Sequence, residues 1–391
     1  MKKCLFFAVF AFFAINSLAA QITVSGILDS TVAMQAGAGG APRFSCGIEE
    51  FANIRFQAGL RSGGTFFGAV NLFAAAGNYA ANAAQMAGFA AALSPGISPT
   101  PYVAGDNYIA GIELERLYFR LNGNKFDFDG GLMRLPFGFG KVWGSTDFLN
   151  PKNPLKPDAR PRGILGAGIF WYPIDELKAL GFSAAPRLPF TQGSDGWLTG
   201  LMLDRHWKKL IVQGLYAYEM PQPGSDKGIH RAGLSVKADV EVSLALDALY
   251  TYNYEAETKW DGLSLSLGAD YSFFDGDLIV LAEYLYNGGT SSTSAKGKTG
   301  GNFSNEHYLY SGLTWVINDF ASASLALISG FDDVSFTPLV SMNYEIFQGA
   351  ALTVSAQVPM DRDLFAANGK RGELGPRFSY FDLTVKLRVR F

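Results

Sequence analysis

The chain has 391 residues and a formal net charge of −3, without a basic block or tail, so nucleic acid is not an expected partner. Hydrophobic residues make up 48% of the sequence, yet after residue 20 no apolar run has the length of a membrane-spanning helix. The 45 glycines, 32 phenylalanines and 17 tyrosines come without a helical heptad pattern, which favours a chain of alternating β-strands.

Residues 1–20 have the pattern of a secretory signal peptide, with two lysines, an apolar run and small residues before Gln21. We therefore expect residues 21–391 to form the folded protein. Cys46 is the one cysteine left in that part, so no internal disulfide is expected. It lies in a Gly/Pro-rich stretch that we interpret as a loop, and we expect it to have no functional role.

Period-two alternation of apolar and polar residues recurs along the chain. The clearest case is 260–273, where leucines and aromatic residues alternate with Ser, Gly and Asp. We count about eighteen such segments, or sixteen if two short ones are loops. Short turns alternate with long connections, notably 77–105, 287–306 and 359–377. With both chain ends on one side, the short turns fall on that side and the long loops on the other, as in transmembrane barrels.

The last segment, 378–391, alternates without a break from Phe381 to Phe391, with charged residues between the apolar ones. It resembles the C-terminal assembly signal of bacterial outer-membrane β-barrels, in which Phe391 would be the terminal aromatic residue. The resemblance implies an all-β, transmembrane antiparallel β-barrel, with long extracellular loops and short periplasmic turns. It also implies contact with outer-membrane lipid and with the barrel-assembly machinery. Tyr250, Tyr252 and Tyr254 suit an interfacial aromatic girdle.

Residues 139–163 follow the fifth predicted strand and contain four prolines, so they form neither a strand nor a helix. The segment resembles the inward-folded third loop that constricts many porins, and its run WGSTDFLNP resembles a stretch in some substrate-selective outer-membrane porins. An ordinary surface loop is the alternative. As a constriction it would contribute the basic residues Lys141, Lys152, Lys156, Arg160 and Arg162, against Asp147 and Asp158.

Charges of both signs occupy the hairpin 112–121 and 126–137. Alternation fails at Glu115-Arg116 and at Gly130-Gly131, where a β-bulge would return the later charges to the inner face. A solvated sheet face is the alternative reading of these residues. As a pore wall, the hairpin would place Glu113, Asp127, Asp129, Arg120 and Arg134 opposite the loop. The strand 51–60 would add Arg55 to the same wall.

The sequence contains no recognisable arrangement of catalytic residues. The three histidines His206, His230 and His307 are far apart and lack the spacing of metal ligands. The sequence also has no nucleophile motif, Walker loop or dinucleotide-binding fingerprint. We predict no enzymatic activity, no metal and no cofactor.

The predicted function is an outer-membrane porin that lets small hydrophilic solutes diffuse through an aqueous channel, with 139–163 as its constriction. Two other classes stay open. A transporter of hydrophobic compounds, resembling the fatty-acid channel family, is favoured by the charge-free stretch 62–105 and opposed by the expected absence of an N-terminal hatch. A surface adhesin is compatible with the long loops. Porins are often trimers, and the sequence leaves the oligomeric state and the substrate open.

Overall fold

A computed structural model describes residues 19–37, 44–60, 63–78, 102–150, 152–155, 163–185, 197–221, 228–252, 262–288, 305–361, 373–374 and 379–391. No helix in these parts of the chain is long and apolar enough to cross a membrane. The strands are β1 Ala19–Gly37, β2 Phe44–Leu60, β3 Gly64–Gly77, β4 Tyr102–Gly105, β5 Tyr108–Asn122, β6 Phe126–Met133, β7 Ile164–Ile174, β8 Leu177–Ala185, β9 Leu198–Trp207, β10 Leu210–Glu219, β11 Ile229–Asp239, β12 Ser243–Tyr252, β13 Leu263–Phe273, β14 Leu278–Tyr286, β15 His307–Asn318, β16 Ala321–Gly330, β17 Ser335–Phe347, β18 Ala350–Gln357 and β19 Ser379–Arg390.

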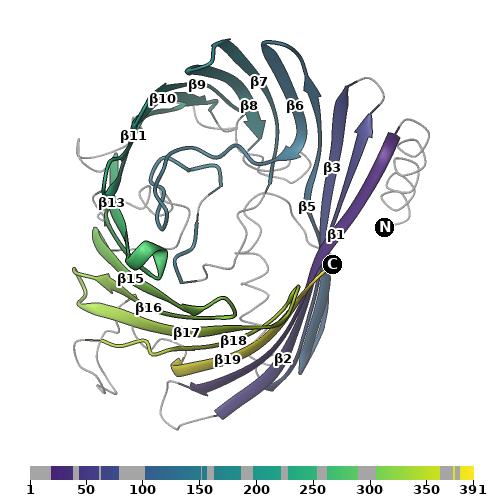
Figure 1. Ribbon diagram of the computed structural model, residues 1–391, viewed down its shortest axis with the longest axis vertical. Coiled ribbons are helices and arrows are strands. Elements are labelled where there is room, and N and C mark those ends of the chain that lie inside the picture. The colour runs from purple at the N-terminus through teal and green to yellow at the C-terminus, as the bar shows by residue number, and fades with distance from the viewer. Residues whose placement is uncertain are drawn as a thin grey trace.

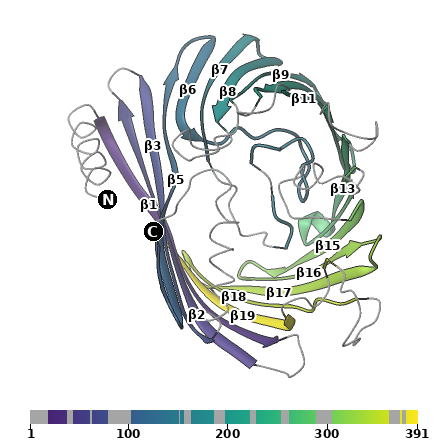
Figure 2. The same cartoon turned by 180° about the vertical axis from the view of Figure 1, so that it is seen from behind.

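These strands form one closed antiparallel barrel (Figures 1 and 2). Each strand of the ring pairs with its neighbour in the chain, and β1 pairs with both β2 and β19, which closes the sheet. The short strand β4 pairs with the beginning of β5 and is not needed for closure, because β3 pairs with β5 directly. The ring therefore has eighteen strands, and the predicted all-β fold is confirmed.

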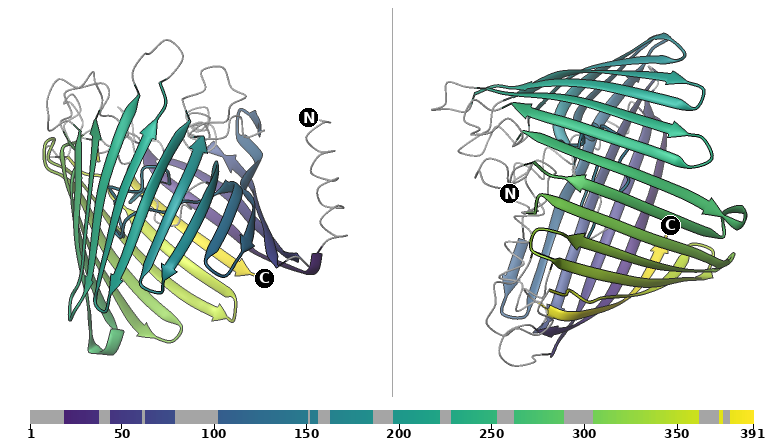
Figure 3. Two further views of the ribbon diagram at one scale, coloured as in Figure 1. Left: turned by 90° about the horizontal axis from the view of Figure 1, so that it is seen from above. Right: turned by 90° about the vertical axis from the view of Figure 1, so that its left-hand side faces the viewer.

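The two ends of the barrel differ in their connections. Most hairpins with short connections, such as 175–176, 208–209 and 348–349, lie at one end, which we call the turn end. The longer connections lie at the other end, the loop end, and Figure 3 shows the tilted strands that join the two. Two connections depart from the prediction, because residues 106–107 join β4 to β5 and residues 331–334 join β16 to β17, both at the loop end.

Alternation along each strand separates an apolar outer face from a more polar inner face. On β13 the outward Leu267 is 53% exposed, whereas Ser264 and Ser266 on the inner face are buried. Tyr250 and Tyr252 are exposed at the loop end of the outer face, as the predicted girdle requires, and Tyr254 lies outside the described residues.

Some boundaries differ from the sequence-based prediction. β2 begins at Phe44, so Cys46 is an exposed residue of a strand and not of a loop. The predicted strand 126–137 ends at Met133, because the next residues turn inward. The predicted bulge at Glu115 is confirmed, since Arg116 pairs with Ala69 and Leu114 with the next residue, Val70. The prediction of a bulge at Gly130-Gly131 is wrong, because the pairings of β6 with β5 and with β7 continue through both glycines without a register shift.

The seam between β1 and β19 depends on a close approach at Gly26. The Gly26 N–H donates to the Phe391 carbonyl at 2.7 Å, and the Phe391 N–H donates back at 3.1 Å. A Cβ at Gly26 would lie 2.4 Å from the Phe391 ring and 2.9 Å from the Asn53 carbonyl oxygen. On the inner face Arg388 donates two hydrogen bonds to Asp29, both 2.7 Å long. The position of the Phe391 side chain therefore requires glycine at position 26.

Replacing Gly26 by valine should destabilise the seam, because overpacking lowers the free energy of unfolding by roughly 1–3 kcal/mol. The measurement is the urea midpoint of unfolding of the barrel refolded in detergent. Gly214→Ala on β10 is the control, since a Cβ there meets nothing within 4 Å. An equal midpoint for G26V and G214A would contradict this account of the seam.

Candidate functional site

A long segment of the chain crosses the interior of the barrel. After Met133 the chain leaves the wall, and residues 134–150 and 152–155 run through the ring as the blue coil in Figure 1 before β7 resumes the wall at Ile164. We call residues 134–155 the inner loop. The predicted inward loop 139–163 therefore begins five residues earlier than expected, at Arg134.

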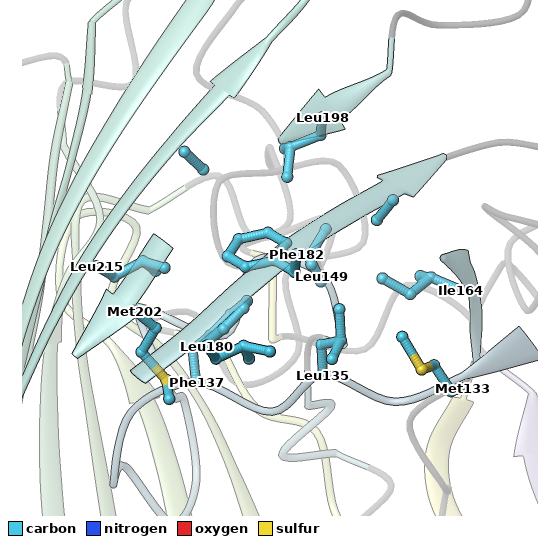
Figure 4. Close-up of a cluster of buried hydrophobic side chains, with 12 residues drawn as sticks. Met133, Leu135, Phe137, Leu149, Ile164, Leu180, Phe182, Leu198, Met202 and Leu215 are labelled. Carbon is cyan, nitrogen blue, oxygen red and sulfur yellow. The ribbon is translucent and has the colours of Figure 1, made fainter. Parts of the chain in front are cut away.

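One side of the inner loop is anchored by apolar packing. Leu135, Phe137 and Leu149 lie in a buried cluster with inward residues of β7 to β10 (Figure 4). The Phe137 ring stacks on Phe148 at 5.8 Å and contacts Phe182 of β8 at 5.2 Å between centroids. Burial of each such side chain contributes about 1.5–3 kcal/mol. The barrel wall contributes Ile164, Leu180, Phe182, Ala184, Leu198, Met202, Leu215 and Ala217 to this cluster.

The far end of the loop has a second apolar anchor. Trp143 is buried against Tyr308 of β15, with 5.3 Å between the ring centroids. Val142 lies in the same cluster, which includes Leu285 and Ile328 from the wall. The inner loop thus spans the barrel between two apolar contacts.

Two buried carboxylates of the wall hold the backbone between these anchors. Asp247 of β12 accepts hydrogen bonds from the N–H groups of Phe139 and Gly140, at 2.9 and 2.8 Å. Glu283 of β14 accepts them from Lys141, Val142 and Trp143, at 2.8, 2.9 and 2.9 Å. Both acidic residues are only 1% exposed. Five consecutive N–H groups therefore compensate for the burial of two carboxylates.

Neighbouring strands add neutral hydrogen bonds to the same segment. Gln213 of β10 accepts from the Gly138 N–H at 2.8 Å, and Ser235 of β11 lies 3.1 Å from the Thr146 hydroxyl. Gly138 has φ +77°, and a Cβ there would lie 2.6 Å from an Asp247 oxygen. Glycine at this position allows the backbone to come close enough to the wall for these bonds.

Two of the predicted basic residues are engaged in holding the inner loop. The Lys141 ammonium forms an ion pair with Asp270 of β13 at 2.8 Å. The Lys152 ammonium donates to the carbonyl of Gly140 in the same loop. Lys156, Arg160 and Arg162 lie outside the described residues.

A charged network covers the wall that faces the loop. Glu115 binds Arg134 at 3.0 Å and accepts from Asn53 at 2.7 Å. Arg55 donates to Asn53 at 2.7 Å, which connects it to the same network. Glu113 joins through Asn71, whose amide donates to it at 3.1 Å and whose oxygen accepts from Asn53.

A second pair lies beside this network. Arg120 of β5 donates two hydrogen bonds to Asp129 of β6, at 2.7 and 2.6 Å. Asp127, the next inward residue of β6 towards the turn end, accepts a hydrogen bond from the Gly123 N–H of the hairpin. The structure thus brings together Arg55, Glu113 and Arg134, pairs Arg120 with Asp129, and places Asp127 next to Asp129 at the turn end of β6.

An open cavity of about 390 Å³ lies between the inner loop and the charged wall. Its charged lining comprises Arg116, Arg120 and Asp129 of the wall, Arg134 at the start of the loop, and Asp147 and Lys152 of the loop. Basic residues outnumber acidic ones four to two. Burial raises the pKa of Asp147 to about 7, although the nearby Lys152 acts in the opposite direction. The cavity is therefore positive at neutral pH.

Sequence reasoning did not single out the residues that fix the loop. Asp247 and Glu283 stand at inward positions of alternating segments, which is the only signal that the sequence carries for them. Their contacts join residues more than 100 positions apart.

No family model and no curated protein matches the chain. Solved structures do match it over almost its whole length. Acinetobacter baumannii OccAB2 has a TM-score of 0.61 at 9% identity, covering 96% of this chain and 99% of its own. Pseudomonas aeruginosa OccK8 (OprE) has a TM-score of 0.55 at 11% identity, with 96% and 98% covered. The outer membrane protein opdK of Pseudomonas aeruginosa has 0.52 at 9%, with 96% and 99% covered. The chain shares their barrel fold.

Removing the Glu283 carboxylate should loosen the inner loop. Glu283→Ala leaves the N–H groups of Lys141, Val142 and Trp143 without their acceptor. At roughly 1.5–3 kcal/mol per charge-assisted hydrogen bond, their protection from hydrogen exchange should fall at least about tenfold. Ser264→Ala is the control, because the buried Ser264 hydroxyl has no hydrogen-bond partner among the described residues. Unchanged exchange of residues 141–143 in E283A would contradict the role of this carboxylate.

Proposed function

We propose that this protein is an outer-membrane channel through which small hydrophilic solutes diffuse, with the inner loop as its constriction. The observation that carries the proposal is the charged cavity of about 390 Å³ between the inner loop and the wall of β5 and β6. A closed barrel with an apolar outer face fits a bilayer, because lipid tolerates no unpaired strand edge. The similarity to an outer membrane protein supports this location. In this proposal Phe391 serves as the assembly signal.

The channel should prefer anions. Arg116, Arg134 and Lys152 line the cavity, whereas the carboxylates of Asp247 and Glu283 are occupied by backbone N–H groups. Selectivity in such channels follows the charge of the narrowest lining. The predicted residues Lys156, Arg160 and Arg162 would add to the positive charge.

A hydrophilic solute fits better than a hydrophobic one. The inward apolar residues of β8 to β10, such as Phe182 and Met202, are covered by Leu135, Phe137 and Leu149 of the inner loop itself. In the cavity on the other side of the loop, six of the ten lining residues are instead charged. The geometry thus favours the porin over the transporter of hydrophobic compounds.

Planar-bilayer recording tests the proposal. We expect stable conductance steps and a reversal potential of anion sign in a salt gradient. Arg116→Ala combined with Arg134→Ala should shift the reversal potential towards cation preference, because two charges leave the cavity. Arg205→Ala is the matched control, since Arg205 lies over the Trp207 ring outside this cavity. No steps from protein shown to be folded would exclude an open channel.

The anion preference should depend on pH through Asp147. With a pKa of about 7, this carboxyl group is neutral in acid and adds a negative charge to the cavity as the pH rises. The reversal potential should therefore show weaker anion preference at pH 8.5 than at pH 5.5, roughly 1.5 units on either side of that pKa. Asp147→Asn should remove the change and keep the preference seen in acid. The same pH dependence in D147N would assign the titration to another group.

A further inference from the structure

A second hollow lies at the turn end of the barrel, where the β7–β8 and β9–β10 hairpins meet. It measures about 430 Å³ and is lined by Glu176, Arg205, His206, Trp207 and Lys208. Glu176 belongs to the first hairpin, and the other four residues belong to the second. The His206 N–H joins the two hairpins there, because it donates to the Glu176 carbonyl at 2.8 Å. The hollow therefore lies on the rim of the barrel, away from the charged cavity beside the inner loop.

Arg205 and Trp207 line this hollow from the lipid-facing side of the wall. They share the outer face of β9 with Leu203, which is 48% exposed, whereas the intervening Asp204 is buried on the inner face. The Arg205 guanidinium lies over the Trp207 ring, 5.6 Å from the ring centroid. Among the strands that the structure describes, Arg205 is the one lysine or arginine on the outer face. A cation here lies at the edge of the hydrocarbon, where aromatic rings contact both lipid and water.

The basic groups of the hollow are available to a ligand. In the described parts of the chain, neither Arg205 nor Lys208 forms an ion pair with a carboxylate. Both line the same hollow as Glu176, which is exposed. Guanidinium and ammonium groups bind phosphate oxygens well, and a carboxylate binds an ammonium group. The hollow therefore offers partners for both charges of a zwitterionic headgroup.

We propose that this hollow binds the headgroup of one phospholipid from the membrane leaflet at the turn end. Arg205 and Lys208 bind the phosphodiester, and Glu176 binds the ammonium group of an ethanolamine headgroup. The acyl chains lie along Leu203 and Leu201, which are 48% and 49% exposed on the outer face towards the middle of β9. These leucines favour a lipid over free phosphate. The inference rests on the proposed location in the outer membrane, and it goes beyond channel function.

Native mass spectrometry of the full chain, refolded in detergent without lipid, tests the proposal. Titration with phosphatidylethanolamine should load one lipid per barrel more tightly than any further lipid. Arg205→Ala should raise the dissociation constant of that first lipid roughly tenfold or more, because a charge-assisted hydrogen bond to phosphate is lost. Lys125→Ala is the matched control and should keep the wild-type constant. It removes an exposed cation from the β5–β6 hairpin at the same end, outside the hollow.

Glu176→Gln tests the ammonium contact separately. It should weaken phosphatidylethanolamine binding roughly threefold, as expected for an exposed ion pair, and leave phosphatidylglycerol, which has no ammonium group, unaffected. Equal weakening of both lipids would refute the role given to Glu176. Inorganic phosphate at the concentration of the lipid should not displace it, since phosphate has no acyl chain to contact Leu203. Displacement would overturn the assignment to a lipid.

The channel itself should be unaffected by the loss of this site. The reversal potential of R205A in planar bilayers should equal that of the wild type, because Arg205 lies outside the charged cavity. Loss of lipid binding and loss of channel function are therefore separate results. Heat-dependent gel mobility establishes that each variant is folded, and Arg205→Gln replaces Arg205→Ala if the latter fails to fold. A wild-type barrel without a preferred first lipid, or an unchanged dissociation constant in R205A, would overturn the proposal.

Discussion

Closure of the sheet is the constraint on which the structure depends. Because β1 pairs with β19 as well as with β2, the ring has no free strand edge, and this pairing joins the two ends of the chain. Closing eighteen strands leaves an interior too wide to be filled by the wall's own side chains. The interior must therefore be occupied by water or by chain, and residues 134–155 supply the chain.

The inner loop is held by two kinds of interaction that differ in specificity. Apolar packing of Phe137 and Trp143 contributes free energy but fixes the backbone only loosely, because such contacts are non-directional. Hydrogen bonds to Asp247 and Glu283 are directional, and each carboxylate would be unfavourably buried without them. The position of the loop and the burial of these acids thus depend on each other. A loop held in this way can narrow a channel to a defined width.

The ring of strands could be predicted because the alternation of apolar and polar residues is visible within each strand, without knowledge of its partners. The segment that became β13 shows its outer and inner faces within eleven residues, and the break at Glu115 indicated the bulge that turns Arg116 and Arg120 inward. Proline content predicted that residues 139–163 form neither a strand nor a helix, and their resemblance to the third loop of porins implied that they fold inward. The partners of the loop could not be predicted, since Asp247 differs from other inward acids only by what faces it. Asp127 was chosen on alternation alone. Alternation shows which face of the wall a residue occupies, but it does not show that Asp127 lies at the turn end.

The interior is asymmetric, and the asymmetry follows from where the loop packs. Its apolar side chains cover the inward face of β7 to β10, so that part of the wall is sealed. Arg134 and Lys152 lie on its other side, where they meet Arg116 and Arg120 across the cavity. Acidic groups balance only part of this charge, because Asp129 pairs with Arg120 and the single carboxylate of Glu115 is shared between Arg116 and Arg134. The folding of one loop therefore sets both where the open space in the barrel lies and the sign of the charge that lines it.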